Sequence, residues 1–133
     1  MSVIRVNFLP EFHYGDDAVL LTMDGAGVDT FRIALSDAIE HGSSQLEHDG
    51  VTHEIQIESG AADIDLEKTR VGWHLDPAKA REINDDLEIS SRKGRAGHNY
   101  VDMSTPAPTL VVSRDEYVDV VYPWIAPGSN NAG

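Results

Sequence analysis

The stretch that decides the fold is residues 45–58, which read QLEHDGVTHEIQIE. Asp49-Gly50 is a strong signal for a two-residue hairpin turn. On both sides of the turn apolar and polar residues alternate, which is the pattern of strands with one face in the core and one in water. The predicted inward face carries Leu46, His48, Val51, His53, Ile55 and Ile57. A sheet with one wet face favours antiparallel strands with helices on the other face.

Two helices are predicted on either side of this hairpin. Over 29–41 apolar residues recur at helical spacing, with Asp29 as the cap and Gly42 following as a natural C-terminal glycine. The second helix is the best signalled element, because Asp76 caps it and Pro77 occupies its first position. Both helices are therefore expected to pack an apolar stripe on the sheet.

Further strands are predicted by short apolar runs at 3–9, 18–23, 63–75, 98–103 and 109–112. Within 63–75 the apolar residues switch from even positions to odd positions, so a turn or bulge is needed near 67–70 to keep both sets facing the core. Ser113 and Glu116 have capping-box spacing, and we expect one helical turn there. The elements together predict an α+β fold: a predominantly antiparallel sheet of about five to seven strands with two helices packed on one face.

The length of 133 residues fits a single domain. We place that domain at residues 1–126 and expect a disordered tail at 127–133, where Gly, Ser and Asn predominate. No internal repeat is apparent.

The charge of the chain is strongly asymmetric. Residues 1–66 hold 13 acidic and two basic residues, a balance of −11, whereas residues 67–133 hold ten and eight, a balance of −2. A surface this negative repels phosphate backbones and anionic lipid, so we expect neither a nucleic-acid nor a membrane partner. Two explanations of the acidity stand side by side: a face for a protein partner, and solubility at high salt.

The chain has no cysteine, which excludes disulfides, thiolate zinc sites and a cysteine nucleophile. Residues 1–9 lack the basic start and the continuous apolar run of a signal peptide, and no run of about 18 apolar residues follows. We therefore expect a soluble, cytoplasmic protein, and no motif in the chain calls for a cofactor.

One strand lines up acid–base groups. His98, Tyr100 and Asp102 alternate with other residues, so a strand places all three on one face. An imidazole shuttles protons near neutral pH, and a carboxylate can hold its tautomer at hydrogen-bonding distance. Neighbours two apart lie nearly 7 Å apart at Cα, so His98 reaches Asp102 only across a bulge. The alternative is a half-buried polar strand face without chemistry.

Three other candidate sites have a weaker sequence signal. His48 and His53 lie diagonally on the inward hairpin face and could share a metal, although no third ligand is signalled. The sequence Asp24-Gly25-Ala26-Gly27 stands where phosphate loops occur, but its acids repel phosphate and a plain turn explains it. The basic cluster 92–95 ends the second helix, and a solvated helix end explains it.

Two functional classes follow. The first is a non-enzymatic binding or interaction protein, in one version an acidic inhibitor or immunity-type protein that covers a basic groove. Its partner face would carry Glu47, Glu54, Glu58, Asp63 and Asp65. The second is a small-molecule binder or simple acid–base enzyme with a pocket around His98, Tyr100 and Asp102. Self-association through C-terminal aromatic residues is a further hypothesis, on Tyr117, Tyr122 and Trp124.

Overall fold

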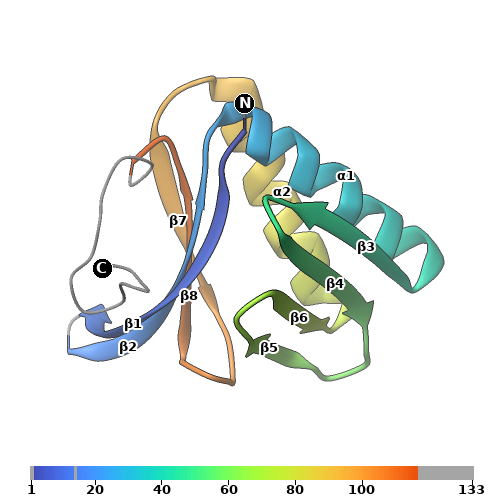
Figure 1. Cartoon of the computed structure of the whole chain (residues 1–133), viewed down its shortest axis with the longest axis horizontal. Coiled ribbons are helices and arrows are strands. Elements are labelled where there is room, and N and C mark those ends of the chain that lie inside the picture. Colours follow the sequence, from blue (N-terminus) through green and yellow to red (C-terminus); the bar gives the residue numbers. More distant parts are fainter. Residues whose placement is uncertain (1, 14, 117–133) are drawn as a thin grey trace.

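The computed structural model describes residues 2–13 and 15–116, which form eight strands and two helices (Figure 1). In chain order these are β1 (Ile4–His13), β2 (Asp16–Met23), α1 (Gly25–His41), β3 (Ser43–His48), β4 (Val51–Ile57), β5 (Ala62–Leu66), β6 (Arg70–Leu75), α2 (Pro77–Lys93), β7 (Gly97–Asp102) and β8 (Thr109–Arg114). The α+β class is confirmed.

The strands form two sheets, where a single sheet of about five to seven strands was predicted, so that prediction was wrong. The first sheet has the order β1-β2-β8-β7 and the second has the order β3-β4-β6-β5. Each sheet is mixed, because its two hairpins are antiparallel but meet through a parallel pair, β2 with β8 and β4 with β6. The helices pack on each other and on both sheets instead of covering one face of one sheet.

The chain consists of two halves with the same architecture, each a hairpin, a helix and a second hairpin. Exchanging the halves converts the strand order of the first sheet into that of the second. Both helices have 17 residues, and their N-caps, Asp24 and Asp76, and their C-caps, Gly42 and Gly94, are 52 positions apart. The expectation of no internal repeat was therefore wrong. The repeat is hard to see in the sequence, because the two halves share their helix caps and inward-facing positions but few residue types.

Three equivalent pairs on the helices show what the repeat preserves. At four, seven and eleven positions after each N-cap both helices carry a buried apolar side chain, and only at the third of these positions is the residue type the same. The buried pairs are Val28 with Ala80, Phe31 with Ile83, and Leu35 with Leu87. All six side chains belong to the shared core. A repeat of this kind leaves almost no identity in the sequence.

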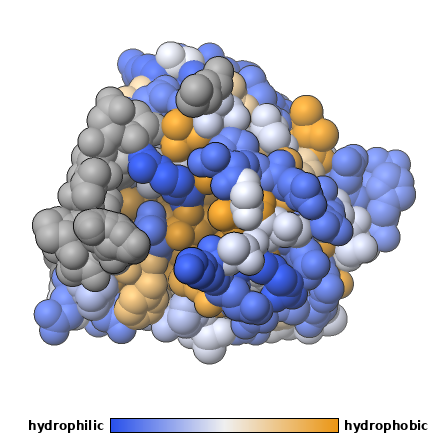
Figure 2. Space-filling model, in the orientation of Figure 1, coloured by the Kyte–Doolittle hydropathy of each residue, from blue (hydrophilic) through white to orange (hydrophobic). Residues whose placement is uncertain are grey.

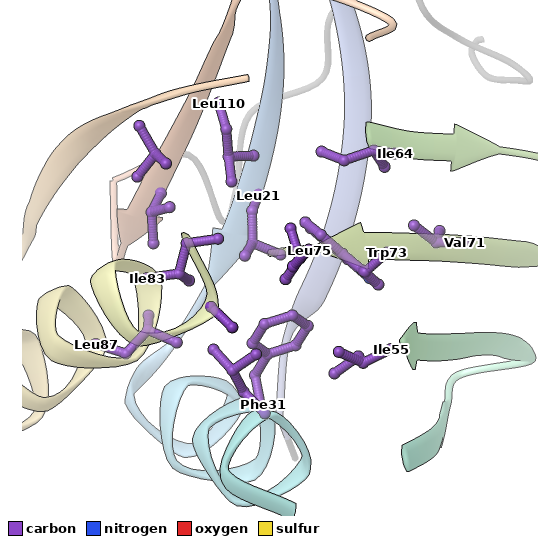
Figure 3. Packing of buried hydrophobic residues seen from close by; sticks show 14 of the residues in the cluster. Leu21, Phe31, Ile55, Ile64, Val71, Trp73, Leu75, Ile83, Leu87 and Leu110 are labelled. Carbon is purple, nitrogen blue, oxygen red and sulfur yellow. The ribbon is translucent and has the colours of Figure 1, made fainter. Parts of the chain in front are cut away.

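One hydrophobic core joins both sheets and both helices. Figure 3 shows Leu21 and Leu110 of the first sheet, Trp73 of the second, and Phe31 and Ile83 of the helices directed toward one another. The rings of Phe31 and Trp73 make an edge contact at 5.3 Å between centroids. A smaller apolar cluster lies on the opposite face of the first sheet, at Leu9, Ala18, Leu20 and Val111.

The predicted hairpin at 45–58 is confirmed as β3 and β4, with Leu46 opposite His53 and His48 opposite Val51. The required turn near 67–70 separates β5 from β6, and Ile64 is paired with Trp73. Two boundaries differ: β1 continues through Pro10 as an edge strand, and Ser113 lies in β8 instead of starting a helical turn. Pro10 is tolerated because proline has no backbone N–H to donate, and an edge strand leaves one row of its backbone groups without a partner strand.

Helix α1 starts four residues earlier than predicted, because Asp24 rather than Asp29 is its N-cap. The Asp24 carboxylate accepts hydrogen bonds from Gly27 N at 2.7 Å and from Val3 N at 3.0 Å. Burial acts to raise the pKa of Asp24, but these two bonds hold it below its ordinary value. The carboxylate thus occupies the helix N-terminus, which leaves no room there for a phosphate.

Replacing Gly27 by alanine is expected to destabilise the protein by about 2 kcal/mol, the middle of the range for overpacking. A Cβ at this position would lie 2.0 Å from the backbone oxygen of Val3, which the capping bond keeps in place. Urea unfolding measures the change. Gly97→Ala is the control, since a Cβ there meets nothing within 4 Å. Equal stability of the two variants would contradict the contact with Val3.

Candidate ligand-binding cavity

A cavity of about 190 Å³ lies between the C-terminal half of α2 and the β7–β8 hairpin. Its apolar wall comes from both helices and the first sheet: Met23, Val28, Leu87, Ile89 and Val112. Its charged and amide side chains are Asp86, Lys93, Arg95, Asn99 and Arg114. For scale, an engineered cavity of about 150 Å³ in another protein binds benzene. The space therefore suits a molecule of a few carbon atoms.

The cavity marks a difference between the two halves of the chain. In the first half β3 begins directly after the C-cap Gly42, and Ser44 Oγ donates a hydrogen bond of 2.5 Å to Ala34 O of α1. In the second half Arg95 and Ala96 separate the C-cap from β7. The longer connection keeps β7 away from α2, and the space between them becomes the cavity.

The cavity is bordered by positive charges. Lys93 and Arg95 form no hydrogen bond or ion pair with any other residue in the described part of the chain. Arg114 is more constrained: its Nε donates to Asp115 Oδ2 at 3.0 Å and its Nη1 donates to Ser90 O at 2.7 Å. Lys93 and Arg95 are exposed, so in a chain with a net charge of −13 their two positive charges are accessible to an anion beside the cavity.

Gly25 gives the guanidinium of Arg114 its place. A Cβ on Gly25 would lie 2.5 Å from Nη2 of Arg114, so a larger residue here would displace the end of that side chain. The two glycines of the sequence Asp24-Gly25-Ala26-Gly27 therefore have packing roles, one against Arg114 and one against Val3. Neither role is phosphate binding.

Among the residues that the structure describes, Asp86 is the one carboxylate that lines the cavity. It is partly buried on α2 and has no hydrogen-bond or ion-pair partner among residues 2–13 and 15–116. Burial raises the pKa of Asp86 above its ordinary value, and the nearby negative charges of Glu82 and Asp85 raise it further. A carboxylate in this position would be stabilised by a cation.

His98 and Tyr100 are brought together on the first sheet, as the strand pattern predicts. His98 Nε2 lies 3.1 Å from Tyr100 Oη, and His98 Nδ1 lies 2.7 Å from Glu116 Oε1. Ser113 Oγ also donates to Glu116 Oε1, at 3.4 Å. The carboxylate beside His98 is thus Glu116, whereas no contact joins Asp102 to it within the described part of the chain.

The His98 group and the cavity lie on different faces of the first sheet. Val101 of β7 is buried in the core, so side chains of the opposite parity, including His98 and Tyr100, project from the other face. His98 borders the cavity at its place in β7, but neither Tyr100 nor Asp102 lines it. These three residues and the cavity charges form two separate groups.

The predicted partner face lies on the second sheet, and most of its carboxylates are engaged there. Glu54 Oε1 accepts two hydrogen bonds from Arg70, at 2.9 and 2.7 Å. Glu58 and Asp65 lie 2.6 and 3.1 Å from opposite ring nitrogens of His74. The hydrogen bond with Glu58, more than that with Asp65, raises the pKa of His74.

The remaining two acids of this face differ. Asp63 accepts a hydrogen bond of 2.7 Å from Thr105 Oγ1, which links β5 to the β7–β8 connection. Glu47 is exposed and has no such partner in the described part of the chain. In the view of Figure 2 the surface is mostly hydrophilic, and hydrophobic residues gather in the hollow between the sheets.

His48 and His53 lie on the inward face of the hairpin, as predicted. His53 Nδ1 accepts a hydrogen bond of 3.3 Å from Trp73 Nε1, and His48 Nε2 lies 2.8 Å from Ser2 Oγ. Burial lowers the pKa of His53 to about 4, with a smaller contribution from His48. Residues 2–13 and 15–116 contain no group of three His, Asp or Glu side chains able to hold a metal ion.

Sequence reasoning named Lys93 and Arg95 only as part of a solvated cluster, and it missed Asp86 and Arg114. The signal that finds Asp86 is the repeat, because its equivalent in the first half is the buried Ala34. The equivalent of Arg114 is Ile57. Arg114 pairs with Met23 in the β2–β8 ladder, Ile57 pairs with Leu75 in the β4–β6 ladder, and Met23 and Leu75 are equivalent positions of the two halves. Both charges therefore replace apolar side chains.

The proposed self-association residues Tyr117, Tyr122 and Trp124, and the proposed tail at 127–133, lie outside the described residues. Among the described residues no helix is long and apolar enough to cross a membrane. No protein-family model, no curated protein sequence and no solved structure matches the chain.

Proposed function

We propose that the protein is a binding domain for a small carboxylate, held in the cavity between α2 and the β7–β8 hairpin. The observation that carries the proposal is a pair of cations at the border of that cavity, Lys93 and Arg95, whose side chains have no partner among residues 2–13 and 15–116. Hydrogen bonds to charged groups are worth about 1.5–3 kcal/mol, so two such donors bind a carboxylate well enough to select it.

The apolar wall supplies the second part of the recognition. Leu87 of α2 and Val112 of β8 belong to the shared core, and they present their surface to a ligand that enters between the helix and the hairpin. A carboxylate with a short aliphatic chain would bury that chain here and place its charge at Lys93 and Arg95. Inorganic phosphate lacks the apolar part and should bind more weakly.

An acidic docking face on the second sheet is a weaker proposal. Four of its five carboxylates already have partners in Arg70, His74 or Thr105. A basic protein would have to displace these groups before it gained the charge attraction. The His98–Tyr100–Glu116 group is a weaker candidate for acid–base chemistry at this cavity, because neither Tyr100 nor Glu116 lines it.

Valerate is expected to bind at low salt, and Lys93→Gln or Arg95→Gln should each weaken binding at least tenfold, the effect of losing one charged hydrogen bond of about 1.5 kcal/mol. Backbone-amide chemical shifts of residues around the cavity report the binding. Arg92→Gln is the matched control, because Arg92 ends the same helix but does not line the cavity.

Two results would contradict this function. The first is the absence of a saturable shift at the cavity with valerate. The second is equal weakening by Arg92→Gln and Lys93→Gln, which would indicate attraction to a basic helix end without a defined site. Inorganic phosphate run in parallel shows whether the apolar chain contributes.

A further inference from the structure

The cavity carries a negative group as well as positive ones, and the opposite charges do not meet. Asp86 is separated from Lys93 by seven residues on α2, which is two helical turns or roughly 10 Å along the axis. No ion pair joins Asp86 to Lys93, Arg95 or Arg114 in the described part of the chain. The cavity thus has one acidic end and one basic end.

The acidic end is not required by the fold. At the equivalent position of α1 the chain has Ala34, and that helix packs closely on β3. Asp86 instead follows two other acids of the same helix, Glu82 and Asp85, whose charges add to the effect of burial in disfavouring its ionised form. A carboxylate placed under such repulsion, next to a cavity and without a partner, is best satisfied by a positively charged group of a ligand.

The distance between the two ends limits the ligand. An α-amino acid carries its ammonium and carboxylate on the same carbon, which is short for groups two helical turns apart. Both side chains lean toward the N-terminus of the helix, but the Lys93 side chain is longer than that of Asp86, so its ammonium can extend back along the helix and shorten the gap. A chain of a few methylene groups between the two charges would then lie along the wall formed by Leu87 and Val112.

We propose that the ligand is a small aliphatic ω-amino acid, with its ammonium group at Asp86 and its carboxylate at Lys93, Arg95 and Arg114. This inference rests on the proposed carboxylate-binding function and adds the positively charged end. It also explains why the cavity of an acidic protein has both an unpaired carboxylate and unpaired cations. Each end matches one end of the ligand.

The test compares δ-aminovalerate with valerate, which differ only in the ammonium group. δ-Aminovalerate should bind the full chain at least tenfold more tightly, and glycine, which is too short, should bind more weakly than either. Isothermal titration calorimetry at low salt measures the affinities, and amide chemical shifts around the cavity verify the location.

Asp86→Asn should reduce the affinity for δ-aminovalerate to that for valerate, while leaving the affinity for valerate undiminished. Glu88→Gln is the control, because Glu88 is exposed on the same helix and does not line the cavity. Unfolding curves of the Asp86→Asn protein show whether it remains folded. A folded variant makes the affinity comparison valid.

The outcomes separate the two proposals. If valerate and δ-aminovalerate bind equally, or if Asp86→Asn leaves their difference unchanged, the ω-amino acid inference is wrong and carboxylate binding stands. If neither compound binds at the cavity, the carboxylate-binding function itself is wrong. Tighter binding of δ-aminovalerate that depends on Asp86 and not on Glu88 supports both.

Discussion

Residues 1–59 and residues 60–133, produced as two separate chains, are expected to stay unfolded alone and to form one folded 1:1 complex when mixed. The cut falls in the exposed Ser59-Gly60 connection between β4 and β5, where no strand or helix is interrupted. Circular dichroism of each fragment and of the mixture, with light scattering for the mass, measures this result.

The physical reason is the exchange of hairpins between the halves. Each fragment contributes one hairpin to each sheet, and the two parallel ladders, β2 with β8 and β4 with β6, join one fragment to the other. Helix α1 also loses its packing on α2 when the fragments are apart. The fragments have 59 and 74 residues, and chains of this length bury a smaller fraction of their surface than the whole chain does, so we expect these losses to leave each fragment unfolded.

The repeat also allows a fragment to pair with a second copy of itself, and charge opposes this for the first one. Residues 1–59 hold 11 acidic and two basic residues, a net charge of −9, whereas residues 60–133 hold 12 and eight, a net charge of −4. Two copies of the first fragment repel each other more than the natural pair does. The mixed complex is therefore expected to dominate at low salt.

Two substitutions in the second fragment control this experiment. Ile83→Asp places a charge in the shared core and should abolish the complex, because Ile83 is 1% exposed. Ile89→Asp lies on the same helix at a residue that is 42% exposed, and should leave the complex intact. Cooperative unfolding of either fragment alone as a monomer would contradict the obligatory exchange.

The second large effect is a loss of stability in mild acid that originates from His53. The free energy of unfolding should fall by roughly 3 kcal/mol between pH 6.5 and pH 4 through this residue, since one pKa unit corresponds to about 1.4 kcal/mol. The His53 ring is 1% exposed and packs on Trp73 and Phe31, with centroids 6.4 and 6.1 Å away.

The sign follows from the direction of the shift. Burial lowers the pKa of His53 from 6.5 to about 4 in the folded protein, so the folded form stays neutral while the unfolded chain takes up a proton. The stability contribution is complete above pH 6.5 and is lost as the pH falls toward 4. His74, whose pKa is raised by Glu58, acts in the opposite direction and loses its contribution as the pH rises.

His53→Asn isolates this effect, because an asparagine oxygen can still accept the hydrogen bond from Trp73 but does not titrate. Urea unfolding from pH 6.5 to 4.5 should show a smaller decline for the variant than for the natural protein. The contribution of His74 is present in both proteins and cancels. His41→Asn, at an exposed histidine on α1, controls for the removal of a histidine. Equal declines in the natural protein and in His53→Asn would refute this origin.

Local signals in the chain predicted the elements well and the site poorly. The hairpin over 45–58, its inward face, and the second helix with its Asp76 cap follow from periodicity and capping. Asp24 was missed as a cap because Gly25 and Gly27 were interpreted as a plain turn, although its bond with Gly27 N is local. The basic cluster was seen, but its cavity depends on the distance between α2 and β7.

By itself, then, the sequence determines an α+β chain, the turn at Asp49-Gly50, and Gly42 and Gly94 as the residues that end the two helices, since hydrophobic period and capping act over a few neighbouring positions. Only the tertiary structure decides that there are two sheets, that His98 meets Glu116, and that a cavity opens between α2 and β7. The parallel pairing of Thr22 with Ser113 shows the reason. Such contacts join distant parts of the chain and depend on how the two halves pack together.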